Sequence, residues 1–215
     1  MNKKIAIYGF GGFGREVKNL IEDINQNSNQ YDFIGFFDDN SNIKNIDTKY
    51  NYLGGIKELN AWEEEICIAI AVGDPKVKKS IVGKIKNTKV EFPNLIHPTV
   101  IGNPNNYTIG KGCIICASNI ITVDISIGNF LILNLSCTVG HDTIIKDFCS
   151  VMPGVNISGE VIFGDCSYIG TGAKIINLVE IGENTIVGAG AVVSKSLPAN
   201  CTAVGIPAKP IKFSN

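Results

Sequence analysis

The sequence predicts a two-part fold, in which a small α/β domain over residues 1–92 precedes an all-β parallel solenoid over residues 93–215. Two observations support this prediction. A bulky apolar residue recurs at every sixth position without a break from Ile109 to Val193. The chain before this repeat alternates between apolar strands, glycine turns and helical stretches, and it carries 13 of the 19 basic and 13 of the 20 acidic residues.

The first part has the element order strand, loop, helix, strand, strand, turn, helix. Strands are predicted over Lys4–Tyr8, Phe33–Phe37 and Glu65–Val72, and helices over Arg15–Ile24 and Val77–Lys86. The glycine loop of residues 9–14 and the turn at residues 73–75 join strands to the helices that follow them. This order is typical of a small α/β domain with a parallel sheet.

The glycine loop has the sequence GFGGFG, in which Gly9, Gly11 and Gly14 keep the spacing GxGxxG. Such glycines let the backbone approach a diphosphate at a helix N-terminus. The acidic pair Asp38–Asp39 follows where a dinucleotide-binding fold would bind ribose. Only about ninety residues precede the solenoid, too few for two mononucleotide-binding halves, so a Rossmann-like half unit suits a nucleotide better than a dinucleotide. A tight turn without a ligand is the alternative.

Arg15, the single arginine of the chain, lies on the first turn of the helix that this loop opens. A guanidinium is poorly placed for the macrodipole there, but it can pair with a bound diphosphate through two charge-assisted hydrogen bonds. The alternative is an exposed helix residue without a ligand.

The period of six belongs neither to an α-helix nor to an alternating strand. An apolar residue at every sixth position fills the interior of a prism whose faces are short parallel strands. We expect the glycines that follow seven of these positions to allow tight turns at the corners. Three hexads close one triangular coil, so residues 109–198 predict about five stacked coils. The repeated positions are Ile109, Ile115, Ile121, Ile127, Leu133, Val139, Ile145, Val151, Ile157, Phe163, Ile169, Ile175, Ile181, Val187 and Val193.

Charge, hydropathy and cysteine usage exclude several classes of function. The formal net charge of −1 offers no basic surface for nucleic acid, and the lysine-rich stretch of residues 76–89 is predicted to be a solvated helix face. Without a long apolar run or a cleavable leader, no membrane insertion and a cytoplasmic location are expected. The seven cysteines are expected to be packed, reduced thiols. Cys113 and Cys116 form a CxxC that lacks the further ligands of a metal site, so no metal is expected.

His141 and Asp142 are the candidate catalytic residues. His141 directly follows the hexad glycine Gly140, where a side chain can leave the prism instead of filling it. A histidine can accept the proton of an amine or hydroxyl that attacks a thioester, while a neighbouring carboxylate holds its tautomer and stabilises the imidazolium. The other histidine, His97, is expected to cap or pack the first coil.

Several segments resemble the family of sialic-acid O-acetyltransferases and bacillosamine N-acetyltransferases, which are hexapeptide-repeat acyltransferases. The segments are the glycine loop with its helix, FIGFFDD, AVGDPK, PNLIHPTVIG, VGHD, IGTGAKI, VGAGAVV and VGIPAKPIK. The resemblance covers nearly the whole chain. It implies a nucleotide-sugar-binding domain followed by a left-handed parallel β-helix that binds acetyl-CoA, in a homotrimer with active sites between neighbouring helices.

The same resemblance implies roles for individual residues. His141 would be the general base and Asp142 its orienting partner. Residues near the sugar nucleotide would be Gly11, Gly12, Arg15, Asp38 and Gly73. Residues near the acetyl thioester or along CoA would be Asn134, Ser150, Gly159, Gly170, Thr171, Gly172, Gly188, Ala189 and Lys209. Ser150 departs from the family, because many relatives carry a second histidine there, and its role is expected to be weaker or taken by a water.

The resemblance therefore predicts an acetyl-CoA-dependent enzyme that N-acetylates a nucleotide-linked amino sugar, such as a UDP-4-amino-4,6-dideoxy sugar, for glycan or glycoprotein synthesis. O-acetylation of a sialic or other nonulosonic acid is a close alternative. A non-catalytic scaffold is a second, although loss of the His-Asp pair would have been its mark. A nucleotidyltransferase with a solenoid tail is a third, and the short glycine loop lacks the length and the basic signature that its N-terminal domain would need.

Overall fold

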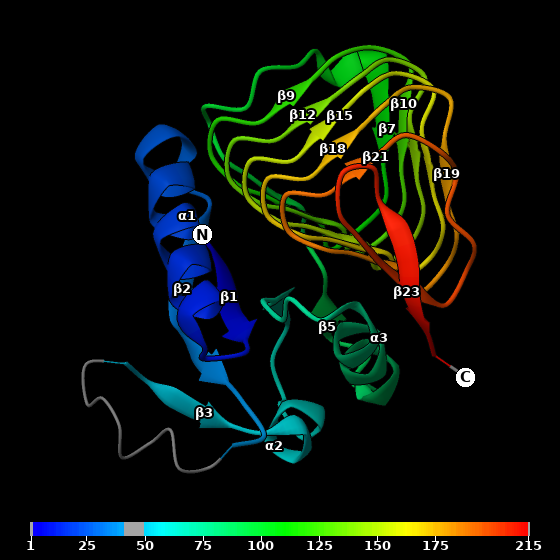
Figure 1. The fold of residues 1–215 in the computed structure, drawn as a ribbon. Coiled ribbons are helices and arrows are strands. Elements are labelled where there is room, and N and C mark those ends of the chain that lie inside the picture. Colours follow the sequence, from blue (N-terminus) through cyan, green and yellow to red (C-terminus); the bar gives the residue numbers. More distant parts are fainter. Residues whose placement is uncertain (1, 41–49, 215) are drawn as a thin grey trace.

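The computed structural model describes residues 2–40 and 50–214, which form an N-terminal α/β unit and a three-sided parallel β-solenoid (Figure 1). Five parallel strands of the N-terminal unit form one sheet in the order β3-β2-β1-β4-β5. Helix α1 packs on one face of this sheet, and α2 and α3 pack on the other. The elements are β1 (Lys3–Tyr8), α1 (Gly12–Ser28), β2 (Tyr31–Phe37), β3 (Tyr52–Gly54), α2 (Ile56–Asn60), β4 (Ile66–Ile70), α3 (Pro75–Lys84) and β5 (Val90–Glu91).

The three predicted strands and both predicted helices of this unit are present, with shifted ends. Helix α1 begins at Gly12 and continues to Ser28, where Asn29 in the left-handed conformation ends it. Helix α3 begins two residues earlier than predicted, because the Asp74 side chain accepts a hydrogen bond from Val77 N and Pro75 fits the first helical position. The short elements β3, α2 and β5 were not predicted.

The solenoid has three faces and five complete coils, as predicted. The first face contains β7 (Tyr107–Ile109), β10 (Ile125–Ile127), β13 (Ile144–Ile145), β16 (Ile162–Phe163) and β19 (Glu180–Ile181). The second contains β6 (Leu95–Ile96), β8 (Ile114–Ile115), β11 (Ile132–Leu133), β14 (Ser150–Val151), β17 (Tyr168–Ile169), β20 (Ile186–Val187), β22 (Cys201–Val204) and β23 (Lys209–Phe213). The third contains β9 (Ile120–Ile121), β12 (Thr138–Val139), β15 (Asn156–Ile157), β18 (Lys174–Ile175) and β21 (Val192–Val193). A 3-10 turn, Pro104–Asn106, precedes the first coil.

The repeated apolar residues fill the solenoid interior. From Ile115 to Val193 every one of them is at most 3% exposed, and Ile109 packs against the same core from the open end. Each fully buried aliphatic side chain stabilises the fold by about 1.5–3 kcal/mol. Because every coil uses the same interior positions, the core runs through the solenoid without interruption.

The glycines that follow the apolar positions have a different role from the one expected. A left-handed residue does occur at each corner, but two positions later in the repeat, and it is often not glycine: examples are Ser136, Asp142 and Glu160. The glycines themselves have ordinary φ values and lie against the next coil. A Cβ on Gly140 would lie 2.6 Å from Gly159 N, and one on Gly170 would lie 2.5 Å from Ala189 N. Glycine at these positions therefore permits close stacking of coils.

The N-terminal unit packs on the second face of the solenoid. One apolar cluster joins residues of α1, β1 and β4 to Ile114, Cys116 and Ile132. Helix α3 adds a polar contact, in which Lys78 Nζ donates to the carbonyl oxygen of Cys149 at 3.1 Å and to Ser150 Oγ at 3.0 Å. Lys78 is only 1% exposed. The two units are therefore held together by both apolar and polar contacts.

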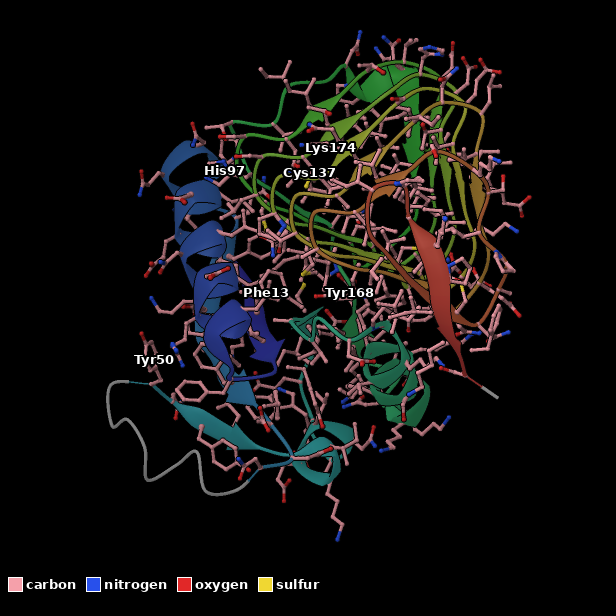
Figure 2. The ribbon with its side chains drawn as sticks, in the orientation of Figure 1. Phe13, Tyr50, His97, Cys137, Tyr168 and Lys174 are labelled. Atoms are coloured by element: carbon pink, nitrogen blue, oxygen red, sulfur yellow. The ribbon has the colours of Figure 1, made fainter. Side chains whose placement is uncertain are left out.

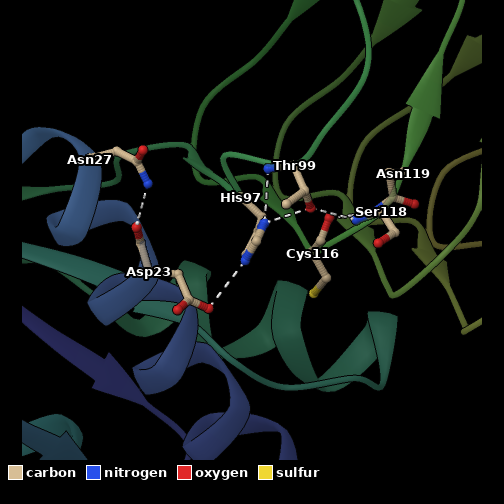
Figure 3. A network of polar contacts seen from close by, with 7 residues as sticks. All are labelled: Asp23, Asn27, His97, Thr99, Cys116, Ser118 and Asn119. Carbon is tan, nitrogen blue, oxygen red and sulfur yellow. Dashed lines mark hydrogen bonds and ion pairs between the residues drawn. The ribbon is translucent and has the colours of Figure 1, made fainter.

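His97 connects α1 to the first coil (Figure 3). Its Nε2 lies 3.1 Å from Asp23 Oδ2 on α1, and its Nδ1 accepts a hydrogen bond from Thr99 N at 3.0 Å. Thr99 Oγ1 in turn accepts from Ser118 N at 2.9 Å. Because Nδ1 accepts a hydrogen bond from the backbone, the ring proton is on Nε2, and Nε2–H donates to Asp23. His97 therefore helps to pack the two units together.

Candidate active site

His141 and Asp142 lie on the edge of the solenoid between its third and first faces, which we call the histidine edge. This edge consists of residues 140–143 between β12 and β13 and the equivalent residues of the other coils. Asp142 has a φ of 55°. Both side chains leave the prism at this turn, and they are 56% and 58% exposed. The site is therefore open to a ligand that lies along the edge.

The His141 imidazole has a defined orientation. Its Nδ1 lies 2.8 Å from Asp142 Oδ2, so Nδ1–H donates to the carboxylate and the lone pair is on Nε2. The ring lies against Gly159 in the next coil, where an added Cβ would be 2.4 Å from Nε2. Among the described residues no acceptor bonds to the Gly159 backbone N–H. A proton acceptor therefore lies beside a buried backbone amide that has no acceptor, an arrangement suited to acyl transfer from a thioester.

The edge between the second and third faces, which we call the glycine edge, presents an open strip of backbone. Gly154, Gly172 and Gly190 occupy its left-handed corner position in three successive coils, with φ of 69°, 71° and 68°. No atom lies within 4 Å of where their Cβ atoms would be. Ser118 and Ser136 adopt the same conformation on this edge, so the turn does not require glycine. The missing side chains leave room for a flat ligand.

The predicted CoA residues Gly170, Thr171, Gly172, Gly188 and Ala189 all fall on the glycine edge. Gly154 and Gly190 were missed, because the left-handed position was assigned to the wrong residue of the hexad. Asn134 also lies on this edge, next to β11. It is 7% exposed, and its Oδ1 accepts from Leu135 N at 2.7 Å. Lys209 begins β23, the exposed last strand of the second face.

Ser150 was expected near the acetyl group or CoA, and the structure places it elsewhere. It points outward from the second face, where the N-terminal unit covers it completely. Its hydroxyl accepts a hydrogen bond from Lys78, as described above. A fully buried side chain has no surface in this chain with which to contact a ligand, so Ser150 is not among the residues that we assign to acetyl-CoA below.

The glycines of the GxGxxG loop divide into two kinds. Gly9 has a φ of 108°, and a Cβ on Gly14 would lie 1.9 Å from the carbonyl oxygen of Gly9, so the turn itself requires both. Gly11, Gly12 and Gly73 have ordinary φ values and no atom within 4 Å of a Cβ position. Local packing does not explain these three glycines, and they leave backbone accessible to another molecule.

Asp38 and Arg15 both contact the loop. Asp38 accepts hydrogen bonds from Phe10 N at 2.9 Å and from Asn40 N at 2.8 Å, so its carboxylate fixes the end of β2 against the glycine loop. Arg15 Nη1 lies 3.4 Å from the carbonyl oxygen of Phe10, and its guanidinium lies 5.8 Å from the centre of the Phe10 ring. Arg15 is exposed above the loop.

A crevice of about 570 Å³ opens at the carboxyl ends of β1, β2 and β4. Its lining includes Tyr8, Gly9, Asp38, Val72 and Lys76. Strands β2 and β4 lie parallel to β1 on its opposite sides, so the strand order reverses at β1. Open α/β sheets bind ligands at the carboxyl ends of the strands at such a point. Burial and the carboxylate of Asp39, to which the hydroxyl donates at 2.7 Å, raise the pKa of Tyr8.

Lys76 and Lys84 are the cations of this crevice, and the sequence analysis had assigned both to a solvated helix face. The signal that was missed is the position of Lys76 in the first turn of the helix that follows β4. Gly73 lines a second hollow next to the crevice, whereas Gly11, Gly12 and Arg15 line neither. The crevice thus unites only Asp38, among the predicted substrate residues, with the unpredicted lysines.

The crevice and His141 lie on different sides of the molecule. The N-terminal unit covers the second face, and the histidine edge lies between the other two faces. One chain therefore does not bring His141 together with the crevice, or with the glycine edge on the far side of the third face.

All seven cysteines are buried and free. Within residues 2–40 and 50–214, no cluster of three histidine, cysteine or acidic side chains is suited to binding a metal ion. In the same ranges, no helix has both the length and the apolar character needed to span a membrane.

Sequence comparison finds relatives of this chain. A family model described as the PglD N-terminal domain matches residues 4–85. Over 158 residues the chain is 32% identical to a GDP-perosamine N-acetyltransferase of Escherichia coli O157:H7, a match that covers 73% of this chain and 71% of the relative.

Solved structures match over nearly the whole chain. The acetyltransferase domain of PglB from Neisseria gonorrhoeae FA1090, in complex with acetyl coenzyme A, has a TM-score of 0.88 at 30% identity, covering 98% of this chain and 100% of that one. PerB from Caulobacter crescentus, in complex with CoA and GDP-perosamine, has a TM-score of 0.85 at 28% identity, covering 97% of each chain. The predicted fold, a Rossmann-like half domain before a left-handed parallel β-helix, is confirmed. The chain is an acetyltransferase and belongs to the hexapeptide-repeat family of bacillosamine and perosamine N-acetyltransferases.

Proposed function

We propose that this enzyme transfers the acetyl group of acetyl-CoA to the amino group of a nucleotide-linked 4-amino-4,6-dideoxy sugar, with His141 as the general base. The observation that carries the proposal is the His141–Asp142 pair, which is exposed on an edge of the β-helix with Nε2 free and against Gly159. The relatives support the substrates, because one is a GDP-perosamine N-acetyltransferase and PglB was solved with acetyl coenzyme A.

The proposed reaction is a direct attack. The sugar amine attacks the thioester carbonyl while His141 Nε2 takes its proton, and Asp142 stabilises the imidazolium that forms. The free Gly159 N–H is suited to donate a hydrogen bond to the developing oxyanion. The new C–N bond replaces the C–S bond, and the CoA thiolate leaves and takes up a proton. No acyl-cysteine is involved, since all seven thiols are buried.

We assign the pantetheine arm of acetyl-CoA to the glycine edge. The strip of Gly154, Gly172 and Gly190 supplies exposed backbone without side chains, and Thr171 and Ala189 are compact neighbours. Asn134 lies on the same edge one coil below Gly154, and its Nδ2 donates to no atom of the described residues. Lys209 at the C-terminal end of the solenoid suits the phosphates of CoA.

We assign the nucleotide of the acceptor to the N-terminal unit. Its crevice lies at the strand ends where parallel sheets bind nucleotides, and Asp38 lines it. Gly73 lies in the adjoining hollow, and Gly11 and Gly12 leave backbone exposed on the glycine loop. Arg15 contacts this loop, and no carboxylate of the described residues pairs with it. Which of the UDP-, dTDP- and GDP-linked amino sugars is the substrate depends on the base and on the sugar that the site accepts. The acetylated product would be an activated donor for glycan or glycoprotein synthesis.

We further propose that the enzyme is a homotrimer. The histidine edge, the glycine edge and the crevice lie on different sides of one chain, so a complete site requires more than one copy. Large apolar side chains are exposed on both edges, including Val123, Leu135, Ile176 and Leu178. A closed cyclic assembly would cover them and place the histidine edge of one copy against the glycine edge of the next. An active monomer in sedimentation would contradict this assembly.

The proposal is tested by incubating the enzyme with acetyl-CoA and a panel of UDP-, dTDP- and GDP-linked amino sugars, with thiol release as the readout. Sialic acid serves as the hydroxyl acceptor for comparison. His141→Ala should lower turnover by roughly 10²–10⁴-fold without a change in folding, the range for loss of a general base. Wild-type rates in this variant would refute the role of His141, and thiol release with sialic acid alone would make the enzyme an O-acetyltransferase.

A further inference from the structure

A second hollow, of about 480 Å³, lies between the N-terminal unit and the second face of the β-helix. One wall is the turn from Gly73 to Pro75. The opposite wall is formed by Met152, Tyr168 and Ile186, with Cys166 and Asn184 beside them. Figure 2 shows Tyr168 on the side of the coils that faces the N-terminal unit. Neither the sequence motifs nor the expected roles involve this wall.

The wall belongs to a column of outward-facing residues that the N-terminal unit covers only in part. Ser150, Tyr168 and Ile186 pair in register on β14, β17 and β20. Ser150 is fully buried under Lys78, whereas Ile186 is 43% exposed. The apolar surface therefore continues past the end of the domain contact, and the hollow lies where this cover ends.

Lys76 joins this hollow to the nucleotide crevice, because it lines both. Its side chain is exposed, and in the described ranges no carboxylate pairs with it. A nucleotide sugar consists of a nucleoside and a sugar joined by a diphosphate. The crevice, Lys76 and the hollow follow one another in the same order as the nucleoside, the diphosphate and the sugar, and the unpaired Lys76 cation matches the diphosphate.

The hollow also leads toward the glycine edge. Met152 is two residues before Gly154, the first glycine of the open strip. A sugar in the hollow would therefore have one end at Lys76 and the other near the edge to which the acetyl-CoA arm is assigned.

We infer that this hollow binds the sugar of the acceptor and that Tyr168, Met152 and Ile186 select a deoxy sugar, with Lys76 on the diphosphate. The inference rests on the proposed function. An aromatic ring packs well against the apolar face of a hexose, and a methyl group at C6 loses less on burial against Met152 and Ile186 than a hydroxymethyl group does. A preference of about tenfold to a hundredfold for the 6-deoxy sugar is expected from such a contact.

Binding measurements test the inference without turnover. The probes are GDP and UDP alone, and two pairs that differ at C6: GDP-mannose with GDP-rhamnose, and UDP-glucose with UDP-6-deoxyglucose. The variants are Tyr168→Ala, Tyr168→Phe, Ile186→Ser and Lys76→Met. Lys79→Met, an exposed lysine outside both hollows, and Ile144→Ser, an exposed isoleucine on the first face, are the matched controls.

The wild type should bind the 6-deoxy sugar of a pair about tenfold more tightly, and Ile186→Ser should abolish that preference. Tyr168→Ala should weaken binding of the nucleotide sugars about tenfold while leaving GDP, UDP and acetyl-CoA unaffected, and Tyr168→Phe should behave as the wild type. Lys76→Met should weaken nucleotides and nucleotide sugars alike. Equal losses for nucleotide and nucleotide sugar in Tyr168→Ala, or no loss, would overturn the inference.

Failure of the inference is distinguishable from failure of the proposed function. Thiol release with an amino-sugar nucleotide together with unchanged acceptor KM in Tyr168→Ala and Ile186→Ser would sink the assignment of the hollow alone. Absence of thiol release with every amino-sugar nucleotide would refute the proposed function. The binding measurements alone would then decide whether the hollow prefers a 6-deoxy sugar.

Discussion

Replacing Lys78 with methionine should change how the stability of the enzyme depends on pH. The Lys78 side chain is 1% exposed, and the oxygens of Cys149 and Ser150 that accept from its Nζ are both uncharged. No ion pair of the described residues includes it. Burial lowers the pKa of Lys78 from 10.5 to about 7, with the thiols of Cys149, Cys113 and Cys166 opposing the shift weakly.

The sign of the effect follows from the lowered pKa. Between pH 7 and pH 10.5 the unfolded chain holds a proton on Lys78 that the folded chain has lost, so the stability contributed by this residue rises with pH. Below pH 7 the buried charge costs the folded state about 5 kcal/mol relative to a neutral amine. Methionine removes this cost, but it leaves two acceptors without a donor, at about 1–3 kcal/mol each.

The variant should therefore match or exceed the wild type in stability at pH 6 and be less stable at pH 10. The difference between the two proteins should change by about 4 kcal/mol over this range. Guanidinium unfolding at pH 6, 8 and 10 and equal protein concentration measures it, with Lys79→Met as the exposed control on the same helix. A difference between Lys78→Met and the wild type that stays constant with pH would refute the assignment of a buried amine with a lowered pKa.

Three further substitutions test the candidate site. Gly159→Ala should lower turnover by about 10²-fold with little loss of stability, because the new methyl group displaces the His141 ring rather than backbone. Wild-type kinetics in this variant would show that the ring position is unimportant. Gly172→Ser places on the strip the residue found at Ser118 and Ser136, so thermal unfolding should change little while the KM for acetyl-CoA rises; an unchanged KM would remove CoA from the glycine edge. Arg15→Ala should raise the KM for the nucleotide sugar roughly ten- to a hundredfold and leave that for acetyl-CoA unaltered, whereas an unaltered acceptor KM would make the glycine loop only a turn.

The repeat could be predicted because every interior position needs a bulky apolar residue, and these residues recur at a fixed spacing in the sequence. Ile115 and Val193 are buried for the same reason, and no knowledge of distant contacts is needed to identify them. The elements β3, α2 and β5 have five residues or fewer, and segments of that length carry no readable period. Two features of the candidate site depend on local sequence alone: His141 and Asp142 are adjacent, and the five residues expected to contact CoA fall on one edge.

What the sequence did not show depends on contacts between distant segments. The period assigns Ser150 to an outward position, but nothing in the hexads shows that α3 covers this position with Lys78. Lys76 was overlooked because the crevice forms only when β1, β2 and α3 come together, and the second hollow forms only where the N-terminal unit meets the solenoid. The glycines at 154 and 190 were overlooked because the corner conformation falls two residues after the glycine that marks the hexad.

The equal stacking of the coils fixes the distance along the β-helix between His141 and the C-terminal end of the solenoid. Adjacent strands in a sheet are about 4.8 Å apart, and three steps separate the coil of β12, next to His141, from the last coil at β21. The distance from the base to the C-terminal end of the solenoid is thus about 14 Å, and it can change only in units of a whole coil, or 18 residues. Insertion or deletion of one coil above Gly159 would leave the His141–Asp142 pair intact but move Lys209 by one step relative to His141. With acetyl-CoA placed as we propose, the number of coils therefore sets the distance that the CoA arm has to span.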